Sequence, residues 1–453
     1  MTQICATKGG QGSKRMIALR DGEVTLLAWC DYVGIMRCRG VPAAALPDQL
    51  AHGLGWAAAG QALTPFEDIA DNPWGPLTEF RQTPVPATHT RLDIWPDTQP
   101  FNIVLCDSMS DGHHWECCTR GFYKVALADL EAETGLTMAA AFEHEFLLTG
   151  EAMSWTVPFS VEQMRKPVRF LSDLTHALTL AMIGLETVEP EFGINQYEIS
   201  TAPAIGVAAG DRAIITREVI RECARRLGCR AGFSPKPTPK SVGNGAHVHF
   251  SLVDAHGTNR TYDASGGKSQ LSVIARQFAA GVVHHMPALC ALVAPSPVSY
   301  LRLGPHHWSC GYASFGVQNR EAAIRVCPSP DPQKRAQGHN LEFRPPDATA
   351  NPYLVLGALV RAGLSGIRQG LPLPQPLGCD PATLSDTDRA AMGIRPLPAT
   401  LGAALDALLA DEIASSWMPA IMRDSYVTVK RKEIAMFAEA SPEALCQRYN
   451  DAY

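Results

Sequence analysis

Charged side chains that recur two residues apart on otherwise apolar segments limit most strongly what this chain can fold into. Residues i and i+2 of a β-strand point to the same face of a sheet, so each pair predicts a strand with one charged face. The pairs are Glu143 and Glu145 in AFEHEFLL, His247 and His249 in GAHVHFSL, and Glu342 and Arg344 in NLEFR. One such pair also fits a surface strand, but several on apolar strands indicate a charged site.

Divalent metal binding is the chemistry that this set of side chains favours. Neighbouring carboxylates repel unless a cation lies between them, and EFGINQYEIS adds Glu191 and Glu198 across a turn. Oxygen ligands with one imidazole suit Mg²⁺ or Mn²⁺, whereas structural zinc prefers thiolates. Guanidinium groups that clamp carboxylates and phosphates are available from Arg302, Arg320, Arg325 and Arg344. A divalent metal with several arginines is typical of phosphoryl transfer.

Composition excludes several other classes of function. The 453 residues are 46% hydrophobic and 19% charged, as in a folded globular protein. A net charge of −6 without a basic patch argues against a nucleic-acid partner. No run approaches the roughly 18 apolar residues of a membrane span, and the first residues have no apolar core that could serve as a signal. We therefore expect a cytoplasmic protein, with its 13 cysteines reduced.

One local cluster has two interpretations. Five potential zinc ligands fall within 13 residues, namely Cys106, His113, His114, Cys117 and Cys118. Their spacing matches no common zinc pattern, so the alternative is a set of ordinary loop and linker residues.

The chain is expected to form two parts, a β-rich domain over residues 1–112 and a larger domain over residues 113–453. The first part contains a hairpin at Glu23–Arg39 and a strand at Phe101–Cys106 that ends in the polar run DSMSDGHH. Helical patterns cover Phe122–Gly135, Lys166–Leu185, Asp211–Leu227, Gln270–Val293 and Asn351–Ile367. Strand patterns cover Leu136–Leu148, Tyr197–Thr201, Ala246–Val253, Ala322–Val326 and Asn340–Arg344.

In order and spacing, these segments resemble the glutamine synthetase family from about Glu143 to Ile367, and more weakly back to Glu23. The specific motifs are the two glutamates of FEHE, GINQYE, GNGAHVHFS, SYLRL, NREAAIR, LEFR and ANPYL. The resemblance implies an α+β fold, with a small β-grasp N-terminal domain and a catalytic domain of curved antiparallel sheet and flanking helices. It also implies a homo-oligomer of two stacked hexameric rings. Its activity would use ATP to convert glutamate to γ-glutamyl phosphate, which an amine then attacks.

The resemblance also implies roles for individual residues. One Mg²⁺ or Mn²⁺ would be held by Glu145, Glu191 and Glu198, and a second by Glu143, His247 and Glu342. Glutamate would be bound by Arg302 and by the backbone of Gly243, with Arg344 facing its γ-carboxylate. Arg320 would neutralise the phosphate in transfer, and the ATP side would include His249, Ser251 and Arg325.

Two departures from the family bear on the nucleophile. Trp308 in SYLRLGPHHWS replaces the glutamate that takes a proton from ammonium, and Ala57, beside Trp56, replaces the aspartate that attracts ammonium. A pocket without these acids neither binds ammonium nor removes its proton, so ammonia is a poor nucleophile. An amine with an apolar or aromatic body would gain from contact with Trp56 and Trp308. His306 or His307 is the candidate replacement base.

Two further departures concern the carboxylate and the phosphates. Asn340 replaces an arginine that lies on the phosphates, and Val242 replaces an asparagine that contacts glutamate. The carboxylate substrate is accordingly glutamate or a close analogue. Lys334 and Arg335 in the preceding loop are candidates for the missing charge.

The favoured function is therefore an ATP-dependent ligase that joins the γ-carboxyl of glutamate, or of an analogue, to an organic amine other than ammonia. Apolar or aromatic amines rank above polyamines, because a polyamine would need acidic residues in its pocket. Two alternatives stay open, namely an ordinary glutamine synthetase that uses ammonia and a catalytically silent scaffold or regulatory protein of the same family.

Overall fold

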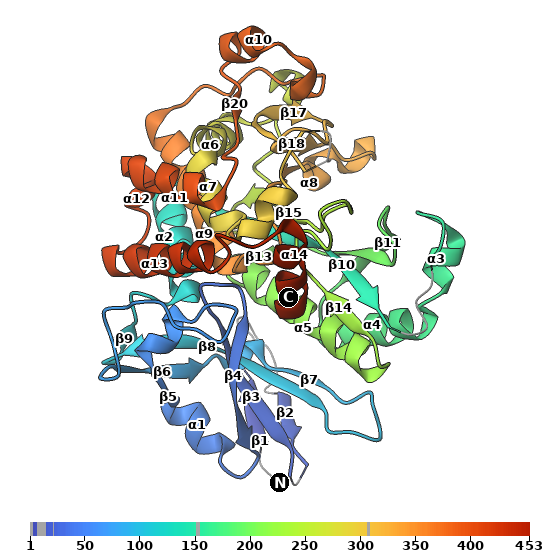
Figure 1. Ribbon diagram of the computed structural model, residues 1–453, viewed down its shortest axis with the longest axis vertical. Coiled ribbons are helices and arrows are strands. Elements are labelled where there is room, and N and C mark those ends of the chain that lie inside the picture. Colours follow the sequence, from blue (N-terminus) through green and yellow to red (C-terminus); the bar gives the residue numbers. More distant parts are fainter. Residues whose placement is uncertain (1–2, 7–14, 21, 151–154, 306–308) are drawn as a thin grey trace.

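The computed structural model describes residues 3–6, 15–20, 22–150, 155–305 and 309–453. Within these ranges a first sheet, within residues 24–114, occupies one end of the molecule, and a helix-covered second sheet, within residues 137–343, occupies the other (Figure 1). We call them the N-terminal sheet and, after the domain that the resemblance implies, the catalytic sheet. None of the described helices combines the length and the apolar character that a membrane span requires.

The N-terminal sheet has the order β4-β3-β8-β6-β5, with β7 and β9 attached to β8, and β1 pairs with β2 apart from it. Hydrogen bonding is antiparallel except between β3 and β8. The strands are β1 (Gln3–Ala6), β2 (Arg15–Ala18), β3 (Val24–Cys30), β4 (Met36–Pro42), β5 (Leu54–Ala57), β6 (Glu79–Pro84), β7 (Thr90–Leu92), β8 (Phe101–Ser110) and β9 (His113–His114).

The polar run after the strand at Phe101–Cys106 does not end that strand, contrary to the sequence prediction. β8 continues to Ser110, and the chain turns at Asp111 and Gly112 into β9. Both turn residues have positive φ, 50° and 81°, as in the Asp-Gly turns that join antiparallel strands. The predicted division after residue 112 falls inside this turn and stays a prediction.

The catalytic sheet has the order β11-β12-β10-β15-β19-β18-β17, with β13 and β14 attached to β10. Its ladders are antiparallel except for β17 with β18, and a separate ladder joins β16 to β20. The strands are β10 (Thr137–Thr149), β11 (Leu185–Pro190), β12 (Gln196–Thr201), β13 (Ala204–Ile205), β14 (Arg230–Gly232), β15 (Ala246–Val253), β16 (Tyr312–Ala313), β17 (Phe315–Val317), β18 (Ile324–Cys327), β19 (Asn340–Phe343) and β20 (Arg395–Pro396). The predicted α+β fold is confirmed.

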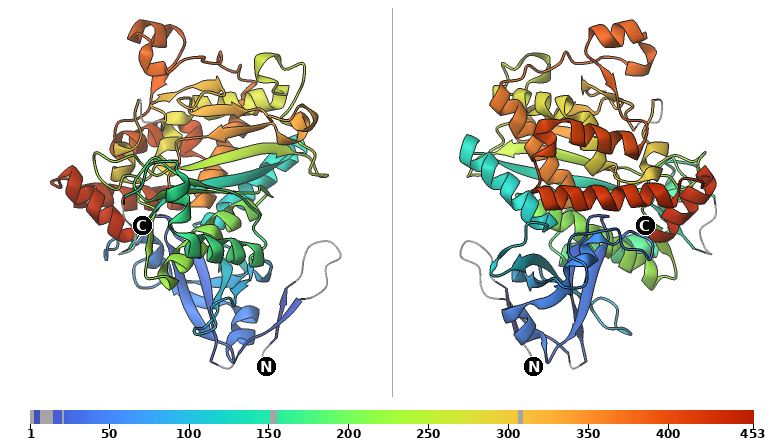
Figure 2. Two further views of the ribbon diagram at one scale, coloured as in Figure 1. Left: turned by 90° about the vertical axis from the view of Figure 1, so that its right-hand side faces the viewer. Right: turned by 60° about the vertical axis from the view of Figure 1, so that its left-hand side comes forward.

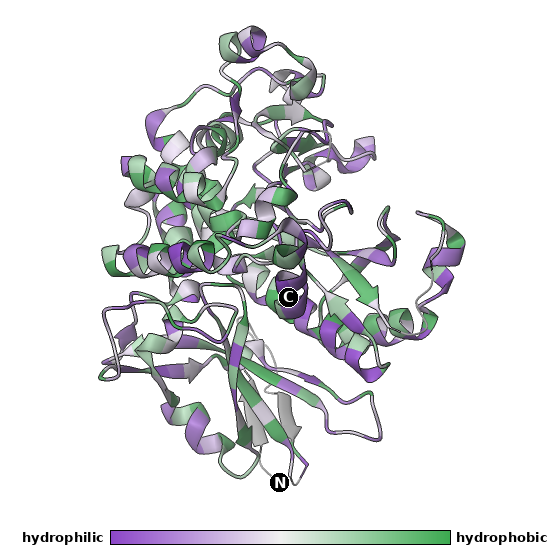
Figure 3. Ribbon diagram, viewed as in Figure 1, coloured by the Kyte–Doolittle hydropathy of each residue, from purple (hydrophilic) through white to green (hydrophobic). Residues whose placement is uncertain are grey.

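The helices cover the sheets and connect them. They are α1 (Leu46–His52), α2 (Thr119–Thr134), α3 (Val161–Arg165), α4 (Val168–Leu180), α5 (Ala208–Arg226), α6 (Val273–His284), α7 (Met286–Val293), α8 (Arg335–Gly338), α9 (Pro352–Gln369), α10 (Asp386–Ala391), α11 (Leu401–Ala410), α12 (Glu412–Ser415), α13 (Ala420–Met436) and α14 (Pro442–Ala452). The longest of the C-terminal ones, α13, crosses the junction between the two sheets (Figure 2) and alternates hydrophobic with hydrophilic residues (Figure 3).

The predicted single helix over Gln270–Val293 is wrong. The chain forms α6 up to His284 and a separate helix, α7, from Met286. Pro287 stands at the second position of α7, where a proline is tolerated because that backbone N–H needs no partner within the helix. Within a continuous helix the same proline would remove a hydrogen bond and clash with the preceding turn.

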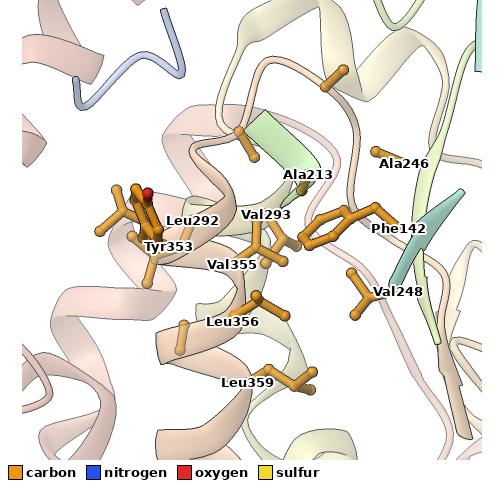
Figure 4. Packing of buried hydrophobic residues seen from close by; sticks show 14 of the residues in the cluster. Phe142, Ala213, Ala246, Val248, Leu292, Val293, Tyr353, Val355, Leu356 and Leu359 are labelled. Carbon is orange, nitrogen blue, oxygen red and sulfur yellow. The ribbon is translucent and has the colours of Figure 1, made fainter. Parts of the chain in front are cut away.

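Strand β10 explains how the charged site is separated from the core. From Thr137 to Leu148 its residues alternate strictly between half-buried and buried positions. The buried set includes Phe142 and Phe146, and Figure 4 shows Phe142 pointing toward Val293 and Val355 of the helices behind the sheet. Glu143 and Glu145 therefore lie on the opposite, accessible face, as the spacing predicted.

The two parts of the chain share one continuous hydrophobic core. The turn between β3 and β4 inserts into the catalytic part, where the Tyr32 hydroxyl lies 3.2 Å from Ser425 Oγ. Arg217 donates a hydrogen bond to the carbonyl of Gly34, and the Tyr453 hydroxyl donates one to the carbonyl of Val33. These contacts hold the N-terminal sheet in a fixed position against the catalytic sheet.

Candidate active site

Strand register brings the predicted site residues into one row across the catalytic sheet. The directly opposed pairs are Glu145 with Glu198, Glu143 with His247, His249 with Glu342, and Arg325 with Glu342. Side chains that face each other across neighbouring strands lie within contact distance. Four strands, β12, β10, β15 and β19, thus contribute predicted ligands that are up to 199 residues apart in sequence, from Glu143 to Glu342.

The second predicted metal set, Glu143, His247 and Glu342, is closely assembled. His247 Nδ1 lies 3.5 Å from an oxygen of Glu143 and 3.5 Å from an oxygen of Glu342. Glu342 is fully buried and forms ion pairs with Arg325 and Arg344. Burial alone would raise the pKa of Glu342, but Arg344 and the neighbouring histidines lower it below the usual value. Its negative charge is therefore compensated by the protein itself.

The first predicted set, Glu145, Glu191 and Glu198, has the opposite electrostatic character. Burial, and then the charge of Glu145, raises the pKa of Glu191 to about 7. Burial and the carboxylates of Glu143, Glu145 and Glu191 raise the pKa of Glu198 well above its ordinary value. A divalent cation would relieve this repulsion, and all the donors are oxygens. The residues present therefore fit Mg²⁺ or Mn²⁺.

His249 lies closer to the predicted metal ligands than its predicted place on the ATP side suggests. Its Nε2 is 3.0 Å from Glu143 Oε1, and Nδ1 is 2.8 Å from Asn340 Oδ1. Ligand atoms of Glu143, His249 and Glu342 lie within 4.8 Å of one another, as do those of Glu143, Glu198 and His247. The sequence contained a signal for this position of His249, because His249 follows His247 by two residues and so points to the same face of the strand.

The predicted glutamate-binding residues meet beside this row. Arg302 is buried; its Nη1 donates to the carbonyl of Pro345 at 2.9 Å, and Nη2 lies 3.3 Å from His247 Nε2. A Cβ at position 243 would lie 2.7 Å from Arg302 Cγ and from the carbonyl of Pro235. Only glycine fits at position 243 without displacing these atoms.

The remaining predicted binding residues differ in their burial and in their contacts with other protein groups. Arg344 is buried beside Glu342, whereas Arg320 is exposed, and its charge acts to lower the pKa of Glu191. Ser251 Oγ donates to the carbonyl of His339 at 3.2 Å. The candidate compensating residues Lys334 and Arg335 are both exposed.

Among the described acceptor residues, Trp56 and Ala57 are not brought to the row of carboxylates by this chain alone. Trp56 and Ala57 lie on β5, in the N-terminal sheet (Figure 1). The Trp56 ring packs edge-on against Trp29 with centroids 4.6 Å apart, and the Arg39 guanidinium lies 5.4 Å from its ring centroid. Ala57 is exposed. His306, His307 and Trp308 lie outside the described residues, so their roles stay predictions.

The cysteine and histidine cluster shows the features of ordinary packing. Asp107, His114 and Cys118 come within 4.8 Å of one another. Asp107 already forms ion pairs with Arg120 at 2.7 Å and Lys124 at 3.1 Å. Cys118 is buried, its Sγ accepts the N–H of Gly121 at the start of α2, and burial raises the pKa of its thiol. The interpretation as linker residues is favoured over a zinc site.

One buried residue of the site was missed by sequence reasoning. Gln196 begins β12, with its side chain 2% exposed, and contacts the loop that carries Gly243. The signal was present, because Gln196 precedes Glu198 by two residues and so shares its face of the strand.

Comparison with known proteins identifies the family. The family model described as glutamine synthetase N-terminal domain matches residues 15–115, and the one described as glutamine synthetase, catalytic domain matches residues 116–449. A γ-glutamylpolyamine synthetase from Streptomyces coelicolor, GlnA3, is 30% identical over the full length of both chains. A glutamine synthetase from Methanocaldococcus jannaschii is 30% identical over 83% of this chain and 82% of its own.

Solved structures agree with this assignment. A crystal structure described as a novel glutamine synthase homologue has a TM-score of 0.88 and 40% identity, covering 97% of this chain and all of its own. A complex of GmaS with ADP has a TM-score of 0.79 and 26% identity, covering 93% and 95%. The chain therefore belongs to the glutamine synthetase family. It is accordingly an ATP-dependent ligase.

Proposed function

We propose that this ligase joins the γ-carboxyl of glutamate, or of a close analogue, to an organic amine other than ammonia. The observation that carries the proposal is the loss of both acceptor acids, with Ala57 and Trp308 at their positions. The full-length similarity to a γ-glutamylpolyamine synthetase supports an amine substrate. Relatives named glutamine synthetase also match, so ammonia is the competing nucleophile to be tested.

The chain's own residues would organise the first half-reaction as follows. Arg302 would bind the α-carboxylate of glutamate, and the carbonyl of Gly243 would accept a hydrogen bond from its ammonium group. Arg320 would neutralise the phosphoryl group in transfer, while Arg344 faces the γ-carboxylate. Fixed cations lower the barrier because two anions must approach each other. Held by the six proposed ligands, Mg²⁺ or Mn²⁺ would add further neutralisation of phosphate oxygens.

ATP would lie at the β15 and β18 end of the row. Ser251 and His249 project from β15 and Arg325 from β18. Asn340 is neutral and accepts a hydrogen bond from His249, so phosphate charge would be met by Arg320 and Arg325, with Lys334 or Arg335 as further candidates. Arg325 forms an ion pair with Glu342; burial alone would lower the pKa of Arg325, but the charge of Glu342 raises it.

Subunit contact would complete the acceptor pocket. Ala57 is exposed on β5, away from the carboxylates of its own chain. We therefore propose a ring homo-oligomer in which β5 contacts the active site of a neighbouring subunit. The expected assembly is a dodecamer of two stacked hexamers. An apolar or aromatic amine body would gain from burial there, whereas ammonium would lose hydration without an anionic partner. We therefore rank apolar and aromatic amines above polyamines.

An amine panel tests the proposal. The protein is incubated with ATP, Mg²⁺ and glutamate plus ammonia, butylamine, phenylethylamine, aniline or putrescine. ADP release is measured, and the γ-glutamylamide is identified by mass spectrometry. We expect little product from ammonia and the most from the apolar or aromatic amines. If ammonia yields glutamine as readily as any amine yields its amide, the protein is an ordinary glutamine synthetase and the proposal is wrong.

Two variants make the test specific. Trp308→Glu should shift preference toward ammonia at the expense of bulky amines, while Trp155→Glu, at an exposed tryptophan, should not. If His306 or His307 is the base, activity should fall below about pH 6 to 7, where the imidazole becomes protonated. In the matching alanine variant, activity should depend much less on pH over this range.

A further inference from the structure

Gln196 connects two parts of the site that the proposed function treats separately. Its Nε2 donates hydrogen bonds to the carbonyl of Gly243 and to Asn244 Oδ1, both at 2.8 Å. The same nitrogen is 3.4 Å from Glu145 Oε2, and Gln196 Oε1 accepts the N–H of Gly193 at 2.9 Å. The amide has two hydrogens, so the two short bonds use its full donor capacity.

The loop that Gln196 holds also binds the Glu145 carboxylate. The N–H of Gly245 donates to Glu145 Oε2 at 2.9 Å, and Asn244 Nδ2 donates to the carbonyl of Ser234 at 2.8 Å. Glu145 Oε1 instead faces His247 Nε2 at 3.9 Å. One oxygen of Glu145 is thus fixed to the loop, and the other is directed toward the row of metal ligands.

Packing leaves this arrangement no space to relax. A Cβ at position 193 would lie 2.5 Å from Gln196 Oε1 and 2.9 Å from Val242 Cγ2. Gln163, on α3, supports the same turn from outside, donating to the carbonyls of Glu191 and Gln196, each at 3.2 Å. Buried amides with satisfied partners hold one conformation, because any movement leaves a polar group unpaired.

We propose that Gln196 is a positioning residue that couples metal binding at Glu145 to glutamate binding at Gly243. This inference rests on the proposed function, which assigns the ion to Glu145 and the glutamate ammonium to the Gly243 carbonyl. Gln196 occupies one acceptor direction of that carbonyl and leaves the other for the ammonium. An ion that fixes Glu145 also fixes the loop through Gly245, so each ligand reduces the ordering that the other requires.

Direct binding measurements test the coupling without turnover. Isothermal titration calorimetry on the EDTA-treated full-length protein gives the glutamate Kd with and without Mn²⁺, and the Mn²⁺ Kd with and without glutamate. We expect Mn²⁺ to tighten glutamate binding about fivefold or more in the wild type, with the reciprocal effect equal. Gln196→Met keeps the length of the side chain but loses the amide. In this variant the ratio of the glutamate Kd without Mn²⁺ to the glutamate Kd with Mn²⁺ should fall to near one.

A matched control separates coupling from a loss of stability. Gln82→Met removes an equally buried amide from β6 in the N-terminal sheet, and should lower the melting temperature without changing the ratio. If Gln196→Met keeps the wild-type ratio of glutamate Kd values and only lowers the melting temperature, as Gln82→Met does, the inference is wrong while the proposed function stays intact. A wild type that binds neither Mn²⁺ nor glutamate would overturn both.

Discussion

Glu145 lies directly opposite Glu198 in the antiparallel pairing of β10 with β12, and both side chains are half-buried. The pKa of Glu198 is raised well above its ordinary value, first by burial and then by Glu143 and Glu145, so its ionised form is disfavoured in the folded protein. The chain retains this arrangement although it opposes folding without metal. Electrostatic strain of this kind is typical of a site built for a ligand.

The first prediction follows from that strain. Glu198→Gln should lower ATP turnover at least about 100-fold, because a metal ligand is lost. The melting temperature of the metal-free protein should stay the same or rise, because a repelling charge is removed. Turnover assays and thermal denaturation in EDTA check the two effects. Glu186→Gln, at an exposed carboxylate on neighbouring β11, should change neither. Unchanged turnover in Glu198→Gln would contradict the ligand assignment.

The second prediction concerns the shared acceptor pocket. Ala57→Arg places a charge at an exposed position, so the chain should fold normally but be nearly inactive in the assembled ring. Coexpression of Ala57→Arg with Glu198→Gln should recover about a quarter of wild-type activity, because a random ring pairs intact halves at that frequency. Activity of purified mixed rings is the measurement. A mixture no more active than either variant alone would mean that each site belongs to one chain.

The third prediction is a pH dependence of stability. Burial alone would raise the pKa of Asp107, but Arg120 and Lys124 lower it below 3.8. A lowered carboxyl pKa gives stability that is present above the unfolded value and lost as pH falls through the folded value. Asp107→Asn should therefore cost about 3–5 kcal/mol at pH 7, and its difference from wild type should narrow below about pH 4. Urea unfolding across this range measures it.

The exposed ion pair of Asp386 with Arg389 provides the control for this experiment. Asp386→Asn should shift the unfolding midpoint little at any pH, because solvent screens an exposed pair. A difference for Asp107→Asn that stays constant down to pH 3 would show that the lost contact is not electrostatic.

The fourth prediction tests the packing of α6 against α9. A Cβ at Gly281 would lie 2.2 Å from the carbonyl oxygen of Ala362 and 2.6 Å from the N of Gly366. Gly281→Ala must push the helices apart and should destabilise the protein by about 3 kcal/mol. Gly402→Ala, in α11 with no atom nearer than 3.7 Å, should instead stabilise it by about 0.5–1 kcal/mol. Chemical denaturation of both variants gives the comparison, and equal effects would contradict the packing argument.

Local patterns were sufficient to predict much of the fold and of the site. The alternation around Glu143 and Glu145 predicted a strand with a charged face, and α2 ends at Gly135, as the helical pattern over Phe122–Gly135 predicted. Both features depend only on nearby residues. The two wrong predictions, the strand end before Asp111 and the continuous helix through His285, also concerned local signals. The Asp-Gly turn and the proline at the second position of α7 were overlooked.

Strand pairing could not be predicted in the same way. Nothing near Glu342 in sequence indicates that Arg325 lies directly opposite it on the neighbouring strand, because this pairing depends on the register of β18 with β19. The role of Gln196 likewise depends on a loop that begins 47 residues later at Gly243. Such contacts become visible only when the sheet is assembled, so individual roles came from family resemblance.

The turn between β3 and β4 affects how the chain folds during synthesis. Domains generally fold in order as they leave the ribosome, N-terminal first. Here the contact partner of Tyr32 is Ser425, 393 residues later in the chain, and that of Val33 is Tyr453, 420 residues later. The buried charge of Asp31 is meanwhile held by Arg37 from the same hairpin. Until the segments that carry Ser425 and Tyr453 have been synthesised, a nascent N-terminal sheet would expose apolar surface, which favours aggregation unless a chaperone covers it.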